Sequence, residues 1–98
     1  MDEDRRWVSV GIDCEMGEDI QNAIWALSDT LAIERNDIQL FYLSRVQIND
    51  IEMQRIIHKQ EDPDYESASL FPAEHPIDAN VLLVFDGYYF TMYLDWEC

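Results

Sequence analysis

Basic residues are scarce in this chain. Its 98 residues include 6 Lys and Arg against 21 Asp and Glu, which gives a net charge of −15. Proteins that grip nucleic acid need a basic surface to face the phosphates, and anionic membranes likewise attract basic segments. The charge therefore predicts a protein that binds neither nucleic acid nor membrane directly, and it favours a basic protein as the partner.

Cysteines and long apolar runs are also few. Cys14 and Cys98 do not suffice for a disulfide scaffold. The start of the chain, residues 1–4, is acidic, the reverse of a secretory signal peptide. No apolar run approaches the roughly 20 residues that a membrane helix needs. We therefore expect a cytoplasmic protein with reduced thiols, and without linkers or repeats we expect residues 1–98 to form a single acidic domain.

Glycine and histidine are too sparse for the common cofactor motifs. Three glycines cannot build a phosphate-binding loop, and the two histidines lack zinc-ligand spacing. The pattern Asp62-x-Asp64-x-Glu66 resembles the start of a calcium loop, but Ser67 and Ala73 occupy positions where such a loop needs Gly and an acid. The sequence predicts no metal site and no cofactor.

Hydrophobic periodicity predicts the first half of the fold. Residues 7–14 alternate like a half-buried strand, and residues 38–48 do so over a longer run. Between them, apolar residues at helical spacing predict an amphipathic helix over about residues 18–34. Because a full helix connects the two strands, a parallel β-α-β pairing is allowed.

The second half is less regular until its end. Residues 49–60 fit a short helix with Asn49 and Glu52 as a capping box, or a returning strand with Asn49-Asp50 as its turn; we favour the helix. Residues 61–80 hold all three prolines and predict a loop. Residues 81–85 and 88–97 flank Asp86-Gly87, which is typical of a two-residue β-hairpin turn.

Together these elements predict an α+β fold. We expect a single small domain with a four-stranded mixed sheet, one long and one short helix on one face, and a C-terminal β-hairpin. The outer face of that hairpin would carry Tyr89, Tyr93, Asp95 and Glu97.

One short motif resembles a known enzyme family. Residues 11–16, Gly-Ile-Asp-Cys-Glu-Met, resemble the first motif of the DEDD-type 3′-to-5′ exonucleases, which implies that Asp13 and Glu15 would hold catalytic metal ions. The family also uses a His followed five residues later by an Asp. Pro63 stands five residues after His58, and Asn80 five after His75. The sequence therefore predicts that the chain is not an enzyme, and a DEDD-like exonuclease fragment stays a remote alternative.

The acids of the second half favour a binding role. Residues 60–98 hold 9 acids and no Lys or Arg. Carboxylates steer basic partners, and tyrosines add rigid contact area. We interpret the chain as a small acidic inhibitor that occludes a basic partner, as a bacterial immunity protein does with a toxin or nuclease domain. A phage-type nucleic-acid mimic that blocks a defence or DNA-binding protein is the alternative. The predicted partner-binding residues lie in a loop and on the hairpin: Asp62, Asp64, Tyr65, Glu66, Tyr89, Tyr93, Asp95 and Glu97.

Overall fold

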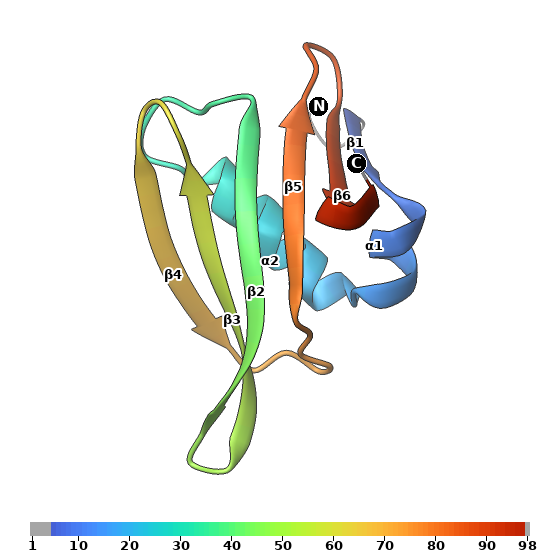
Figure 1. Ribbon diagram of the computed structural model, residues 1–98, viewed down its shortest axis with the longest axis vertical. Coiled ribbons are helices and arrows are strands. Elements are labelled where there is room, and N and C mark those ends of the chain that lie inside the picture. Colours follow the sequence, from blue (N-terminus) through green and yellow to red (C-terminus); the bar gives the residue numbers. More distant parts are fainter. Residues whose placement is uncertain (1–4, 98) are drawn as a thin grey trace.

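The fold is a six-stranded mixed sheet with two α-helices (Figure 1). A computed structural model describes residues 5–97. The strands lie in the order β1-β6-β5-β2-β3-β4; β1 and β6 are parallel and the other neighbours antiparallel. The expected α+β class with a mixed sheet and two helices is confirmed, but six strands replace the expected four. The elements are β1 (Arg6–Val8), α1 (Val10–Glu15), α2 (Glu18–Asp29), β2 (Ile38–Ile48), β3 (Ile51–Gln60), β4 (Tyr65–Phe71), β5 (Ala79–Phe85), β6 (Phe90–Leu94) and the 3₁₀ helix η2 (Asp95–Glu97).

Helix α2 covers one face of the sheet. Its residues Ile20 and Ile24 are one turn apart and fully buried, and they join a single apolar cluster with Phe41 and Leu83 from the sheet. The helix ends at Asp29, before the predicted Glu34; its C-cap Thr30 has left the helical conformation, and the Thr30 hydroxyl donates to the carbonyl of Ala26 at 2.8 Å. Within residues 5–97, neither helix has the length and apolarity of a membrane-crossing segment.

The preferred helix over residues 49–60 is wrong, and the alternative of a returning strand is right. Asn49 and Asp50 have positive φ angles of 53° and 67°, the conformation of a two-residue hairpin turn that Asn and Asp tolerate well. Strand β3 runs back along β2 from Ile51, which pairs with Ile48. The tip of this hairpin extends past the rest of the sheet (Figure 1).

The short helix lies instead where a strand was expected, at residues 10–15. The Ser9 hydroxyl caps α1 by accepting from the backbone N–H of Ile12, and it donates to the Glu97 carboxylate at 2.5 Å. The same carboxylate accepts from the backbone N–H groups of Gly11 and Leu94. A negative charge is therefore fixed at the start of a helix only six residues long. Strand β1 is only three residues long and pairs with β6 rather than with residues 38–48.

Three further expectations about residues 61–97 need correction. Residues 65–71 form the edge strand β4 rather than loop. Strands β5 and β6 pair antiparallel, but Phe85 pairs with Phe90, so four residues connect them instead of the predicted two-residue turn. The Asp86 carboxylate accepts from the backbone N–H groups of Tyr88 and Tyr89, which stabilises this wider loop. Strand β6 ends at Leu94, so residues 95–97 lie in η2 and not on a strand.

A buried polar chain connects β2, β3 and the loop after α2. His58 and Gln39 are at most 1% exposed, and the His58 Nε2 atom lies 2.6 Å from the Gln39 side-chain oxygen. The Gln39 amide donates to Gln60, whose own amide donates to the carbonyls of Glu34 and Pro63. His58 stacks on Phe41 with a centroid separation of 4.4 Å. Burial lowers the pKa of His58 from 6.5 to about 4, so the ring is neutral at pH 7.

Candidate protein-binding surface

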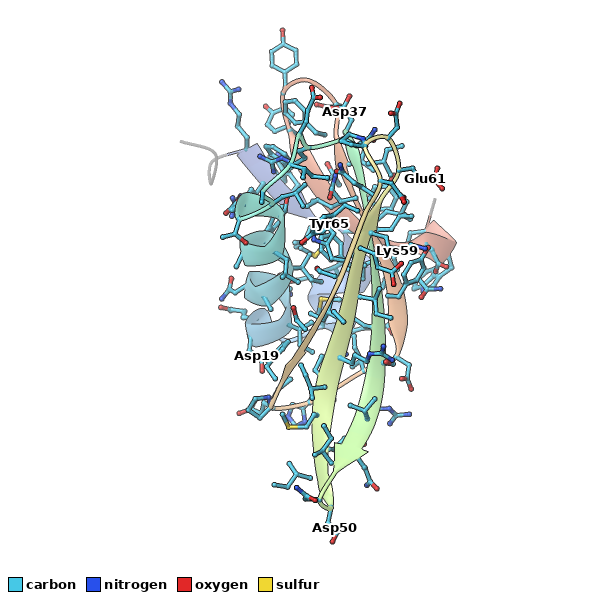
Figure 2. The ribbon with its side chains drawn as sticks, turned by 90° about the vertical axis from the view of Figure 1, so that its left-hand side faces the viewer. Asp19, Asp37, Asp50, Lys59, Glu61 and Tyr65 are labelled. Carbon is cyan, nitrogen blue, oxygen red and sulfur yellow. The ribbon has the colours of Figure 1, made fainter. Side chains whose placement is uncertain are left out.

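Among the described residues, helix α2 covers one face of the sheet, and the opposite face is largely open (Figure 2). Figure 2 shows α2 on one side of the strands and the Lys59 side chain on the other. On this side the strands carry mostly apolar and aromatic residues, and several are strongly exposed: Trp7 by 56%, Ile38 by 48% and Tyr42 by 38%. We call the uncharged part of this surface the open face; its members are Trp7, Ile38, Leu40, Tyr42, Ile57, Asn80, Leu82, Val84, Thr91 and Tyr93, and Lys59 lies beside Leu40 on the same side.

The register explains why these side chains form one surface. Residues opposite each other on neighbouring strands share a face, so Leu40 lies beside Leu82 and Leu82 beside Tyr93. The next row runs from Ile38 through Val84 to Thr91, and Trp7 pairs with Thr91 at the sheet edge. The Trp7 ring also meets Tyr89 edge to face at 5.9 Å. An apolar surface that spans several strands marks an interaction site more often than a single exposed residue does.

An acidic cleft lies at the end of the sheet where β5 begins and β6 ends. It has a volume of about 380 Å³, and four of its lining side chains are Glu15, Asp78, Asp95 and Trp96. Trp96 is 67% exposed, and the Asn80 amide donates to Asp95 at 3.3 Å. We call this site the acidic cleft. Glu15 and Asp95 supply two carboxylates, and Trp96 supplies an indole ring. A Lys or Arg side chain binds such groups by ion pairing and cation–π contact.

The third carboxylate of the cleft is occupied within the chain. Asp78 accepts from the backbone N–H and the Nε atom of Arg45 at 2.9 and 3.0 Å. The backbone bond is the main cause that holds the pKa of Asp78 below its ordinary value of 3.8. Asp78 is therefore charged at pH 7 but already paired, which leaves Glu15 and Asp95 to receive a cation.

The residues predicted on the last strand separate into two groups. Tyr93 lies on the open face, Tyr89 lies against Trp7, and Asp95 lines the acidic cleft. Glu97 is different, because its carboxylate accepts three hydrogen bonds that fasten α1 to the end of β6. These bonds, above all that from Ser9, lower the pKa of Glu97, and the side chain has a structural role.

The predicted loop residues lie far from the residues predicted on the last strand. Strand β4 is four positions from β6 in the sheet, about 19 Å at about 4.8 Å per strand. Asp62 and Asp64 lie in the β3–β4 turn, and Glu66 lies 3.7 Å from the Lys59 ammonium group. Tyr65 points to the helix side, where its ring meets His58 edge to face at 5.3 Å. The predicted loop residues and the predicted strand residues therefore do not form one patch.

The exonuclease resemblance does not extend to the local structure. Its first motif ends a strand, whereas Asp13 and Glu15 lie in helix α1 and are exposed. Within residues 5–97, no cluster of three or more His, Cys, Asp or Glu side chains is arranged to hold a metal ion. Cys14 is a free, exposed thiol, and Cys98 lies outside the described residues.

Sequence reasoning missed most of the open face. The signal was present in residues 38–43, where both alternating sets are largely apolar. Phe41 and Leu43 belong to the buried set, and Ile38, Leu40 and Tyr42 to the open one. A strand that is apolar on both sides is either covered twice or forms an interface.

Comparisons with known proteins place the fold. A crystal structure of a protein of unknown function from Enterococcus faecalis superposes on this chain with a TM-score of 0.79. The two are 24% identical, and the superposition covers 99% of this chain and 93% of the other. No protein-family model matches the chain, and no curated protein matches it. The likeness shows a shared architecture.

Proposed function

We propose that the chain is a binding inhibitor that docks on a basic protein and blocks it. The biological setting that fits best is a bacterial immunity protein that neutralises a nuclease-type toxin. The supporting charge is large, with 21 acids against 6 bases. Such a charge speeds association with a basic surface, most strongly at low ionic strength.

The open face is the observation that carries the proposal. It offers Trp7, Tyr42 and Tyr93 on a rigid sheet, where aromatic side chains lose little entropy on binding. Desolvated aromatic and apolar contacts of this kind dominate the affinity of protein interfaces. The charged residues on this side of the sheet, Arg55, Lys59 and Glu66, lie on β3 and β4, and most of the apolar residues lie on the other strands.

The acidic cleft gives the interface its selectivity for a basic partner. Asp95 and Glu15 would pair with a Lys or Arg side chain of the partner, and Trp96 would stack on it. A partner without that cation would leave two carboxylates desolvated and unpaired, which opposes binding.

The apolar character of the open face favours an inhibitor over a nucleic-acid mimic. A mimic needs carboxylates in place of phosphates along its contact surface. Here the centre of the sheet presents Leu40, Leu82 and Val84 instead. We therefore prefer a partner with a specific cleft to a general DNA-binding protein.

Capture and inhibition test the proposal together. Proteins retained by the wild-type chain are compared with those retained by the double variant Asp95→Ala with Trp96→Ala, and by the control Asp13→Asn with Glu18→Gln. The control side chains are exposed and lie on the two helices. The proposal expects a basic protein that is lost with the cleft variant, kept with the control, and inhibited on binding. A partner that is acidic, or that stays fully active in the complex, contradicts it.

A further inference from the structure

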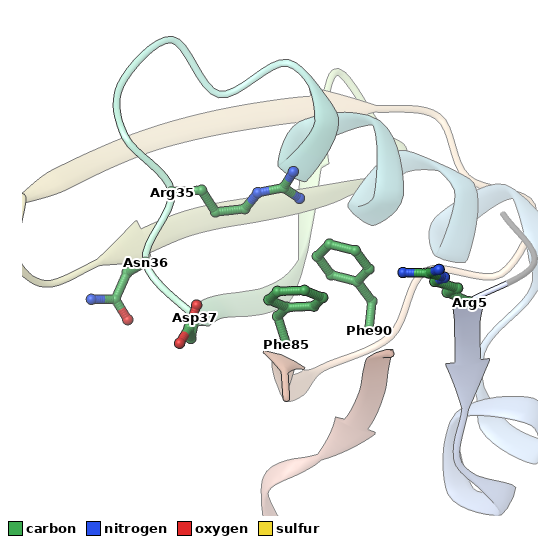
Figure 3. Close-up of a pocket in the computed structure, with 6 residues that line it drawn as sticks. All are labelled: Arg5, Arg35, Asn36, Asp37, Phe85 and Phe90. Carbon is green, nitrogen blue, oxygen red and sulfur yellow. The ribbon is translucent and has the colours of Figure 1, made fainter. Parts of the chain in front are cut away.

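A second cleft lies on the other side of the sheet, at the end where β6 begins. It has a volume of about 340 Å³ and is lined by Arg5, Arg35, Asn36, Asp37, Phe85 and Phe90 (Figure 3). We call it the arginine cleft. Phe85 and Phe90 belong to the same strand faces as the buried Leu83 and Met92, so this cleft opens away from the open face.

Its two arginines are unusual for a chain so rich in acids. Arg6, Arg45 and Lys59 each lie within 4 Å of a carboxylate. Among the described residues, Arg5, Arg35 and Arg55 have no such partner, and the first two line this one cleft. Figure 3 shows their guanidinium groups pointing into the space around Phe90. Two guanidinium groups that form no ion pair within residues 5–97 attract an oxyanion, against the single carboxylate of Asp37 in the same lining.

Arg35 is held in place. Its Nη1 atom donates to the Ser28 hydroxyl at 2.9 Å, and its guanidinium carbon lies 4.9 Å from the centre of the Phe90 ring. A guanidinium group has about five N–H donors, so most of them stay available to a ligand. Preorganisation of this kind reduces the entropy lost on binding.

Two aromatic rings form part of the wall of the cleft. Phe85 and Phe90 stack with centroids 4.5 Å apart and an angle of 26° between the rings. The Asn36 side chain already makes two hydrogen bonds within the chain: it accepts from the backbone N–H of Ile38 and donates to the backbone carbonyl of Asp62. Phenylalanine surface beside guanidinium groups suits a ligand that joins a flat ring to an anion.

We propose that the arginine cleft binds a small molecule in which an oxyanion, phosphate or carboxylate, is attached to a planar ring. The anion pairs with Arg5 and Arg35, and the ring packs on Phe85 and Phe90. The Asp37 carboxylate at the rim accepts from a donor on the ring. This site is separate from the open face, so it does not depend on the proposed inhibitor function.

Titrations with small probes test the site. Adenosine 5′-monophosphate and indole-3-acetate each carry both parts of the ligand and distinguish phosphate from carboxylate, whereas inorganic phosphate and adenosine carry one part each. Calorimetry and NMR shifts of Phe85 and Phe90 measure binding to the full chain. We expect at least one two-part probe to bind about tenfold more tightly than either single part, with shifts confined to the cleft.

Charge-matched variants separate this site from general anion attraction. Arg5→Gln and Arg35→Gln should each weaken the best probe about tenfold. Arg55→Gln removes an equal charge from an exposed position outside the cleft and should leave binding unchanged. Within residues 5–97 the Arg5 side chain forms no hydrogen bond or ion pair, so we expect Arg5→Gln to leave the fold intact. Absence of binding by every probe, or equal losses with Arg5→Gln and Arg55→Gln, would overturn the proposal.

Discussion

Replacement of His58 by Gln should remove much of the acid sensitivity of this fold. The imidazole is fully buried and stacked on Phe41, and its Nδ1 atom has no hydrogen-bond partner. Its Nε2 atom faces the Gln39 oxygen and donates to it, which leaves Nδ1 unprotonated. Protonation would therefore place a charge and an unpaired donor in the core. His58→Gln keeps a donor for Gln39 and removes the titrating group.

The size of the effect follows from the two pKa values. The folded-state pKa of His58 is about 4, against 6.5 in the unfolded chain. Between these values the unfolded state binds the proton and the folded state does not, so stability falls as pH is lowered through this window. The loss between pH 7 and pH 4 is about 3 kcal/mol, a large part of the roughly 5–15 kcal/mol that holds a domain together.

Urea unfolding of both proteins between pH 7 and pH 4 measures this effect. The carboxylates are the same in both chains, so their contribution cancels in the difference between wild type and variant. We expect the wild type to lose about 3 kcal/mol more than His58→Gln over this range. Parallel pH profiles for the two proteins, or a His58 resonance that titrates near pH 6.5 in the folded state, would refute the reasoning.

Three other predictions concern the fold. Gly11→Ala should lower the melting temperature, because a Cβ atom there would come within 2.7 Å of the Glu97 carboxylate; Gly17→Ala, which meets only the flexible end of Asp19, should cost less. Ser9→Ala removes the side-chain cap of α1 and should cost about 1 kcal/mol in urea unfolding. Moderate NaCl should raise the melting temperature, because salt screens the repulsion among a net charge of −15; a flat response would mean that the acids are compensated locally.

The strength of the periodic signal decided which elements could be predicted. Residues 38–48 alternate over eleven positions, and β2 has the bounds that this pattern predicts. Strand β3 was hidden because its buried face is Gln54, Ile56, His58 and Gln60, of which only one is apolar. Hydrogen bonds allow Gln54, His58 and Gln60 to be buried although they are polar. A pattern of alternating apolar residues does not reveal buried positions of this kind.

Long-range contacts explain the remaining errors. Val10 and Cys14 alternate with Ile12 as in a strand, yet both are exposed on a helix that depends on Glu97, 86 residues away from Gly11. No pattern in the sequence around residues 9–15 indicates that a distant carboxylate caps this helix. The candidate site was predicted in part for a similar reason. Tyr93 and Asp95 could be predicted from their positions in the last expected strand. Trp7 and Tyr42 join the open face only because of the order in which the strands pair.

The proposed inhibitor function depends most on the open face and the acidic cleft forming one binding surface. The most direct measurement is the affinity of the inhibited basic partner for Tyr42→Ala, for Asp95→Ala with Trp96→Ala, and for the control Asp13→Asn with Glu18→Gln, at matched ionic strength. Truncation at the centre of an interface typically costs about 2 kcal/mol, so we predict about thirtyfold weaker binding for the first two variants and little change for the control. Strong loss of affinity in the helix control, with the other two variants unaffected, would contradict the account and place the interface on the helix side of the sheet.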